Sequence, residues 1–213
     1  MKHILITGST DGIGKLLAKK LAKEGHTVYV HGRNPEKLNA TISEIKAATN
    51  NPNIDGFIAD LSDLEAVKQL AIEVKEKDSV LDVIINNAGV YNSSKSHNSD
   101  GLDMRFAVNY LAPYVLTEAL LPLLKASENT RIINLSSAAQ ATVNINTLLG
   151  KVNESERATY AQSKLALTMW SFYLAQQESS LNIIAVNPGS LLDTKMVHKA
   201  FGQVWSPAEK GVD

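Results

Sequence analysis

The chain has 213 residues, 21 of them basic and 22 acidic, so its formal net charge at pH 7 is −1. This balance removes the electrostatic reason to expect nucleic acid or an anionic membrane surface as a partner. The chain contains no cysteine, which excludes disulfides, zinc–thiolate sites and a cysteine nucleophile. Its content of 44% hydrophobic and 20% charged residues is that of a globular protein, and its length predicts a single domain over residues 1–213.

No targeting or membrane segment is expected. The apolar run near the N-terminus ends at Gly8 and is too short for the hydrophobic region of a signal peptide. No stretch approaches the ~20 apolar residues needed to span a bilayer. The three glycosylation sequons, at Asn39, Asn92 and Asn153, are therefore interpreted as chance. We expect a cytoplasmic protein without a membrane span.

Short apolar, β-branched runs alternate with helical patterns along nearly the whole chain. In chain order we predict a strand at 4–7, a helix at 13–24, a strand at 27–31, a helix at 35–48, a strand at 54–59, a helix at 63–75, a strand at 81–86, a helix at 102–125, a strand at 131–135, a helix at 158–179 and a strand at 181–187. Consecutive apolar residues are expected of strands buried on both faces of a parallel sheet. The alternation predicts an α/β fold, a doubly wound parallel sheet in three layers with right-handed crossovers.

Local signals refine two of these helices and one connection. Asn34 before Pro35, and Ser62, are predicted helix starts. The apolar face of the first helix is predicted to consist of Ile13, Leu16, Leu17 and Leu21. The polar region 138–157 has weak periodicity, and a long irregular connection inside a compact domain is typical of a functional loop.

Three glycines, Gly8, Gly12 and Gly14, follow the first strand directly and open the first helix. The first allows a tight turn, the second lets the backbone approach a pyrophosphate, and the third lets helix and strand pack closely. The alternative is a plain strand-to-helix turn, but the strand and helix on either side favour dinucleotide binding. A P-loop is excluded because Ser9 stands where it needs Gly, and Leu16 where it needs Ser or Thr.

The end of the second strand bears on which dinucleotide binds. An NAD-preferring fold places an acidic side chain there, whereas an Arg suits the 2′-phosphate of NADP. The segment 30–34 has no acid and offers Arg33. We therefore expect NADP, with NAD as the less favoured cofactor and a solvated surface role as the alternative for Arg33.

Tyr160 and Lys164 lie four residues apart, on one face of the predicted helix 158–179. A tyrosine with an ordinary pKa of about 10 is a poor acid or base at neutral pH, and a nearby cation lowers that pKa. Further polar residues follow other strands at the edge where open α/β sheets bind ligands. These are Asn86–Gly89, Asn109, Ser136, Ser137, Asn187–Gly189 and Thr194.

Taken together, these motifs resemble the short-chain dehydrogenase/reductase superfamily, which has a Rossmann-type fold. The matching motifs run in order along almost the whole chain: Thr7-Gly8-x-x-x-Gly12-x-Gly14, Asn86-Asn87-Ala88-Gly89, Asn109, Ser137, Tyr160-x-x-x-Lys164 and Asn187-Pro188-Gly189. The long segment between Ser137 and Tyr160, and the phrase Ser163-Lys164-Leu165-Ala166, are similar to the retinol-dehydrogenase-like branch.

The resemblance implies an oxidoreductase that transfers a hydride between NADP(H) and a small-molecule alcohol or carbonyl substrate. Tyr160 would be the general acid/base, Lys164 would lower its pKa and bind the nicotinamide ribose, Ser137 would hold the substrate oxygen, and Asn109 would position a water for proton relay. The cofactor-binding positions implied are Gly8, Ser9, Gly12, Ile13, Gly14, Arg33, Asp60, Asn87, Ala88, Gly89, Tyr160, Lys164, Pro188, Gly189 and Thr194. In this family the helix after the tyrosine often packs against a second subunit, which implies a homodimer or homotetramer.

Other readings remain open. Asn87 and Asn109 could tie strand and helix together, and Ser136 is expected to be a scaffold hydroxyl. His31 and His97 have no partners at ligand spacing, so no metal is expected.

At the level of the whole protein, a non-catalytic dinucleotide sensor of the same fold is the alternative function. A nucleotide-sugar epimerase would need a tighter glycine motif and many more residues. Residues 206–213 resemble the start of a further helix, and since relatives continue into a seventh strand we expect the chain to be incomplete there.

Overall fold

The computed structural model describes residues 1–212. Six strands form one sheet: β1 (His3–Ile6), β2 (Thr27–Gly32), β3 (Ile54–Ile58), β4 (Val83–Asn86), β5 (Arg131–Leu135) and β6 (Asn182–Val186). The main helices are α1 (Gly12–Lys23), α2 (Pro35–Thr49), α3 (Leu64–Lys77), α5 (Ala112–Lys125) and α7 (Glu156–Gln177). Shorter helices are α4 (Met104–Phe106), the π-helix Ala107–Leu111, α6 (Ile145–Leu148), α8 (Lys195–Phe201) and the 3-10 helix Ala208–Gly211.

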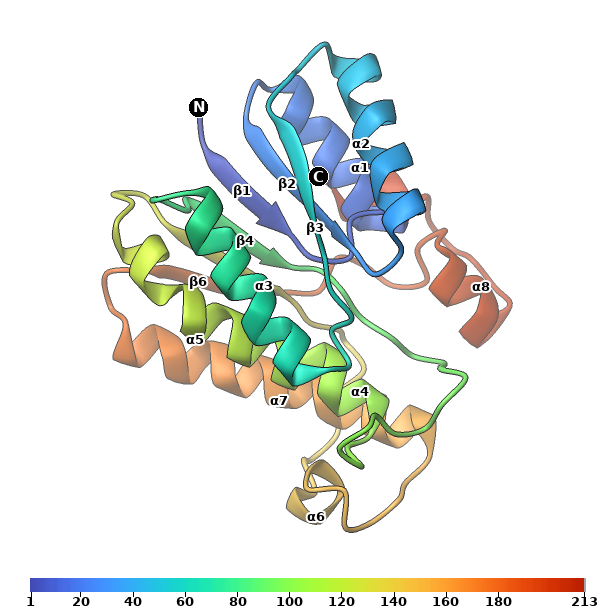
Figure 1. Cartoon of the computed structure of the whole chain (residues 1–213). Helices are drawn as coiled ribbons and strands as arrows, with labels where there is room; N and C mark the ends of the chain where they lie inside the picture. Colours follow the sequence, from blue (N-terminus) through green and yellow to red (C-terminus); the bar gives the residue numbers. More distant parts are fainter. Residues whose placement is uncertain (213) are drawn as a thin grey trace.

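The sheet is parallel throughout, with the strand order β3-β2-β1-β4-β5-β6. Helices α1 and α2 cover one face, while α3, α5 and α7 cover the other (Figure 1). Side chains of β1 alternate between the two cores: Leu5 packs toward α3, α5 and α7, and its neighbours Ile4 and Ile6 pack toward α1 and α2. The chain reverses its winding direction between β1 and β4, which opens a crevice at the carboxyl ends of these strands.

The predicted doubly wound fold is confirmed. With α4, the π-helix and α5 taken as one helical run, Met104–Lys125, the ends of the predicted strands and helices differ from the observed ones by at most two residues. The predicted helix start at Ser62 is wrong. Asp63 caps α3 instead, because its carboxylate accepts hydrogen bonds from the backbone N–H groups of Glu65 and Ala66. Ser62 donates its hydroxyl to Asp60 at 2.8 Å, which leaves it outside the helix.

The predicted apolar face of α1 is correct only in part. The residues that α1 buries against the sheet are Gly14, Ala18 and Ala22, with Leu17 and Leu21 packed beside them. Ile13 and Leu16 lie outside this core. Helix α1 approaches the sheet so closely that only small side chains fit between them. The large apolar residues therefore lie toward the side of the helix.

Residues Met104–Lys125 form one continuous helical run of 22 residues with a mean hydropathy of 1.3 in its most apolar window. By length and composition alone this run could cross a membrane, which the sequence analysis did not expect. Half of that window is buried inside the protein. The run is the core helix that packs against α3 and the sheet.

The region 138–157 folds around α6, which the sequence pattern did not indicate. Glu154 organises this region by accepting three side-chain hydrogen bonds. The donors are Asn144, which precedes α6, Thr147 within α6, and Gln162 of α7. These hydrogen bonds lower the pKa of the Glu154 carboxyl. The loop is therefore attached to α7 beside Tyr160 through a polar network.

Candidate active site

A cleft of about 650 Å³ opens at the carboxyl ends of the strands. One end is lined by the glycine turn after β1 and by Arg33, and the other by Ser137, Tyr160 and Lys164. The tertiary structure thus brings together side chains that lie more than 120 residues apart in the chain. A parallel sheet does this because all its carboxyl ends meet at one edge.

The glycine turn needs glycine at each of its three positions. Gly8 and Gly12 have φ angles of +64° and +51°, a region that other residues rarely adopt. A Cβ at Gly8 would lie 2.8 Å from the Ala88 Cα, and one at Gly14 would lie 2.4 Å from the Asn87 Nδ2. At Gly12 the nearest atom to such a Cβ is 3.7 Å away, so the backbone there borders open space in the cleft.

His31 and Ser9 hold the backbone of this turn in place through hydrogen bonds. Both are buried, and the His31 Nδ1 accepts a hydrogen bond from the Gly8 N–H at 3.0 Å, while its Nε2 lies 3.2 Å from the Ala59 carbonyl oxygen. Burial lowers the pKa of His31 to about 4, so the ring is neutral at pH 7. Ser9 donates to the Ile6 carbonyl and accepts from the His31 N–H, and it does not line the cleft. These hydrogen bonds give Ser9 a structural role in the turn, and its role as a cofactor contact stays a prediction.

Arg33 is exposed at the end of β2 and lines the cleft opposite Asp60. Burial acts to raise the pKa of Asp60, but hydrogen bonds from Ser62 and the charge of Arg33 outweigh it and hold that pKa below its ordinary value. Asp60 is therefore ionised at neutral pH. Among the residues that the structure describes, no group of three or more His, Cys, Asp or Glu side chains could hold a metal ion.

Asn87, Ala88 and Gly89 connect the glycine turn to the chemical end of the cleft. The Asn87 amide donates to the carbonyl oxygens of Thr7 and Gly8, and the Ala88 N–H donates to the Thr7 hydroxyl. All three residues line the cleft. A Cβ at Gly89 would lie 3.5 Å from the Lys164 Nζ, so glycine leaves space beside the lysine.

Tyr160 and Lys164 project from α7 toward this space. The Lys164 Nζ donates to the Leu135 carbonyl oxygen at 2.7 Å and lies 5.8 Å from the centre of the Tyr160 ring. Burial lowers the pKa of Lys164 to about 8. Burial also raises the pKa of Tyr160, and the neighbouring Tyr91 raises it further. The hydrogen bond with Ser137 acts to lower this pKa but does not outweigh burial. Desolvation thus dominates both groups, and the net shift of the Tyr160 pKa is upward. That Lys164 lowers this pKa stays a prediction.

The two serines after β5 have different surroundings. The Ser136 hydroxyl is buried and contacts the Lys164 carbonyl oxygen at 3.1 Å and the Thr168 hydroxyl at 2.6 Å, so it fastens α7 to the sheet. Ser137 is partly exposed and hydrogen-bonds with Tyr160. Both serines line the cleft, but the Ser136 hydroxyl is held by α7 whereas Ser137 is partly exposed.

Asn109 lies in the π-helix and is buried. Its amide oxygen accepts from the Val90 N–H, and its amide nitrogen donates to the Val90 carbonyl and to the Ser163 hydroxyl. The side chain therefore joins the segment after β4 to α7, and it does not line the cleft.

The segment after β6 closes the cleft from above. Pro188, Gly189 and Thr194 line it, Gly189 has a φ of +126°, and the Thr194 hydroxyl accepts from the Val197 N–H to cap α8. Asp11, which the sequence analysis did not single out, holds α8 against the glycine turn. Its carboxylate accepts from Lys195 of α8 and from Lys37 of α2, each at 2.8 Å.

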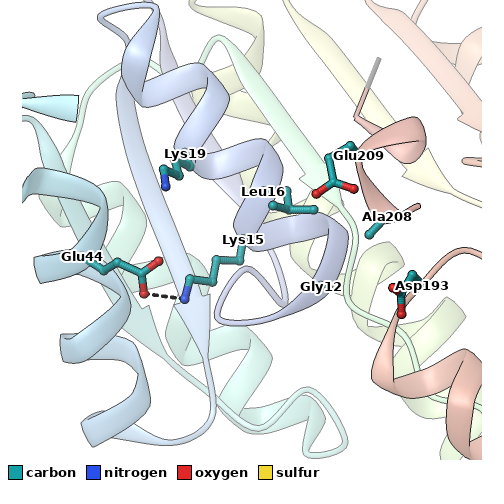
Figure 2. A pocket seen from close by; sticks show the side chains of 8 residues that line it. All are labelled: Gly12, Lys15, Leu16, Lys19, Glu44, Asp193, Ala208 and Glu209. Atoms are coloured by element: carbon teal, nitrogen blue, oxygen red, sulfur yellow. Dashed lines mark hydrogen bonds and ion pairs between the residues drawn. The ribbon is translucent and has the colours of Figure 1, made fainter. Parts of the chain in front are cut away.

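A second hollow, of about 350 Å³, lies on the outer side of α1 and is shown in Figure 2. The Lys15 side chain extends from α1 toward α2, where its ammonium is paired with Glu44. Asp193 and Glu209 lie at the opposite side, toward the C-terminal segment. Of the site residues predicted from the sequence, only Gly12 borders this hollow.

The cleft fits a dinucleotide. Its glycine turn offers open backbone at the start of α1, where N–H groups and the helix dipole favour phosphate. Arg33 supplies a cation at one end, and Lys164 and Tyr160 supply polar groups at the other. The residues that would hold the cofactor are therefore those of the turn, Arg33, Asn87–Gly89, the Tyr160–Lys164 pair and the segment 188–194.

Comparisons with known proteins agree with this geometry. The family model of the short chain dehydrogenases matches residues 2–204. Human retinol dehydrogenase 13 is 36% identical over 195 residues, covering 88% of this chain and 58% of the relative. Human polyprenol dehydrogenase is also 36% identical over 195 residues, with 87% and 59% covered. A short-chain dehydrogenase from Shigella flexneri, solved with NADP, has a TM-score of 0.79 and 30% identity, covering 98% of this chain and 87% of that one.

The chain thus spans somewhat less than two thirds of the length of the curated relatives it matches. The match to the family model nevertheless includes the glycine turn, the Tyr160–Lys164 pair and all six strands. This chain belongs to the short-chain dehydrogenase family.

Proposed function

We propose that the protein is an NADP(H)-dependent oxidoreductase that interconverts an alcohol and a carbonyl compound. The observation that carries this proposal is the convergence of Ser137, Tyr160 and Lys164 at one end of a cleft whose other end is the glycine turn. A dinucleotide lying along the cleft would have its phosphates at the turn and its nicotinamide beside Tyr160. When bound, it supplies or accepts the hydride.

In carbonyl reduction the Tyr160 hydroxyl donates a proton to the substrate oxygen, and in alcohol oxidation it removes one. Its raised pKa keeps it protonated at neutral pH, which suits the donor role. The Ser137 hydroxyl holds the same substrate oxygen and stabilises the negative charge that develops on it. The Lys164 ammonium, 5.8 Å from the tyrosine ring, supplies positive charge to a tyrosinate and reaches the ribose side of the cleft.

Arg33 supports NADP over NAD, because its guanidinium can pair with a 2′-phosphate at the end of β2. The structure of the Shigella relative was solved with NADP. We expect Arg33→Ala to weaken NADPH binding at least tenfold more than NADH binding, as measured by isothermal titration calorimetry. Equal losses for the two dinucleotides would contradict the assignment of the 2′-phosphate to Arg33.

Relatives named retinol dehydrogenase and polyprenol dehydrogenase support an alcohol or aldehyde as the substrate class. The decisive experiment replaces Tyr160 by Phe and measures NADPH-dependent reduction of a panel of aldehydes and ketones. We expect a loss of kcat of at least about 100-fold, since general acid catalysis contributes about that much, with NADPH binding unchanged. Tyr173→Phe is the matched control, because Tyr173 lies on the same helix and is exposed.

Turnover by Tyr160→Phe close to that of the Tyr173→Phe control would refute Tyr160 as the acid. Tight NADPH binding by the wild-type chain, with no turnover of any compound in the panel, would instead favour a non-catalytic dinucleotide sensor.

We also propose that the protein is a cytoplasmic homo-oligomer. Met169, Phe172 and Tyr173 on α7 are more than half exposed and form an apolar face, which supports contact with a second copy. Light scattering during size-exclusion chromatography would measure the mass, and a monomer at all concentrations would contradict this part of the proposal.

A further inference from the structure

Arg105 of α4 is one of the most completely buried side chains of the protein, with 1% of its surface exposed. Its guanidinium pairs with both carboxylate oxygens of Asp103, at 2.8 Å from Nε and 2.6 Å from Nη2. A buried cation is costly unless its donors are satisfied, and burial of an ion pair is in itself weak evidence for stabilisation. The remaining donors of Arg105 therefore indicate what else the residue does.

Those donors reach two segments that border the cleft. The Nη1 donates to the Glu156 carboxylate at 3.0 Å and lies 3.5 Å from the Tyr91 carbonyl oxygen, while the Nη2 lies 3.4 Å from the Ser96 carbonyl oxygen. Glu156 is the first residue of α7, and α4 lies against this helix (Figure 1). One side chain thus joins α4, the loop 91–96 and the start of α7.

Glu156 strengthens the same connection from the other side. Its second carboxylate oxygen accepts from the Asn92 amide at 2.8 Å, and Asn92 lines the cleft. Tyr160 follows Glu156 by one helical turn, and its ring contacts the Tyr91 ring, with centroids 4.9 Å apart and planes inclined by 52°. The position of Tyr160 therefore depends on how the start of α7 is held against the loop 91–96.

We infer that Arg105 is a positioning residue for Tyr160: through Glu156 it holds the start of α7 and the loop 91–96 together, so that the Tyr91 ring stays packed against the Tyr160 ring. This inference rests on the proposed function for its catalytic meaning. The titratable groups that face Tyr160 are Tyr91 from the loop and Lys164 from its own helix, and Ser137 faces it from the end of β5.

Glu156 is the side chain to change. Replacing Arg105 would leave the buried Asp103 carboxylate without its partner and could prevent folding. Glu156→Ala keeps the Arg105–Asp103 pair intact and alters a side chain that is 42% exposed. Glu156→Gln keeps an oxygen acceptor for the Nη1 and is the conservative variant. Arg157→Ala, at the exposed neighbouring residue of the same helix turn, is the matched control.

The first measurement does not depend on activity. In protein carrying [13Cζ]tyrosine, with the Tyr160 signal assigned through Tyr160→Phe, the tyrosine hydroxyl is titrated by NMR in the wild type and the three variants. In Glu156→Ala we expect water to enter beside Tyr160 and to lower its pKa, since burial is what raises it. Glu156→Gln is expected to fall between the wild type and Glu156→Ala, and Arg157→Ala to match the wild type.

The second measurement is NADPH-dependent carbonyl reduction. We expect Glu156→Ala to lose about tenfold in kcat, as small misplacements of a reacting group do, with NADPH binding unchanged because the glycine turn is untouched. Thermal unfolding of each variant separates this effect from a loss of folding.

The outcomes are distinct. If Glu156→Ala and Arg157→Ala share one Tyr160 titration curve and one kcat, Arg105 has only a structural role and the inference is overturned, whatever the thermal midpoints are. If the wild type reduces no carbonyl compound but the Tyr160 titration shifts as expected, the proposed function fails while the positioning of Tyr160 by Arg105 and Glu156 stands.

Discussion

His31 makes the stability of this protein sensitive to moderate acid. Burial holds its pKa at about 4 in the folded protein, against an ordinary value of 6.5. As the pH falls below 6.5 the unfolded chain binds a proton at this position before the folded protein does, so the free energy of unfolding decreases. The contribution is complete above pH 6.5 and is lost progressively toward pH 4. With these two pKa values the loss is about 2 kcal/mol at pH 5 and about 3 kcal/mol at pH 4.

The assay compares the wild type with His31→Asn in urea unfolding at several pH values from 7.5 to 4. Asn offers an oxygen to the Gly8 N–H in place of the Nδ1 and does not titrate, but it gives up the contact with Ala59. We expect the variant to be about 1 kcal/mol less stable at pH 7.5, through that lost hydrogen bond. The difference should shrink as the pH falls and reverse sign at about pH 5.8. Carboxylates that do not interact with His31 affect both curves alike and cancel in the comparison, whereas Asp60 interacts with His31 and does not cancel.

Parallel stability curves for the two chains over this range would refute the reasoning, because they would mean that His31 is protonated in the folded state as readily as in the unfolded chain. The buried Trp170 provides a fluorescence signal for unfolding.

Two further predictions concern the packing of the cleft. Gly14→Ala should destabilise the fold by about 1–3 kcal/mol in the same urea assay and weaken NADPH binding, because its Cβ would lie 2.4 Å from the Asn87 side chain; unchanged stability would mean that α1 can move away from the turn. Ser136→Ala should cost about 1 kcal/mol through the contact with the Lys164 carbonyl but keep most of the kcat for carbonyl reduction, whereas Ser137→Ala should keep stability and lose kcat. Equal kinetic losses for the two serine variants would contradict their assignment to separate roles.

Much of the fold could be predicted because its signals are local. Runs of apolar residues identify strands buried on both faces, and the glycine spacing after β1 reports a turn that only glycine can form, with φ angles above +50° at Gly8 and Gly12. The four-residue spacing of Tyr160 and Lys164 places them on one face of α7 whatever surrounds the helix. The order of alternating elements then allows very few sheet topologies.

The sequence pattern was misleading where burial depends on the distance between elements. Apolar periodicity assigned Ile13 and Leu16 to the core face of α1, but α1 packs so closely that Gly14, Ala18 and Ala22 face the sheet. The same limit applies to the pKa of Tyr160. Its spacing to Lys164 predicts a lowered value, whereas its burial, which no local pattern reports, raises it.

Sequence alone determined the order of strands and helices, the glycine turn and the pairing of Tyr160 with Lys164, since each depends on neighbours within a few residues. The tertiary structure alone decided which distant charges and hydrogen-bonding groups meet at the cleft. Asp11 pairs with a lysine 184 residues away, and Arg105 with a glutamate 51 residues away. Such pairs arise because folding brings strand ends and helix starts to one edge of the sheet, and the chain positions of the partners carry no periodic signal from which that meeting could be predicted.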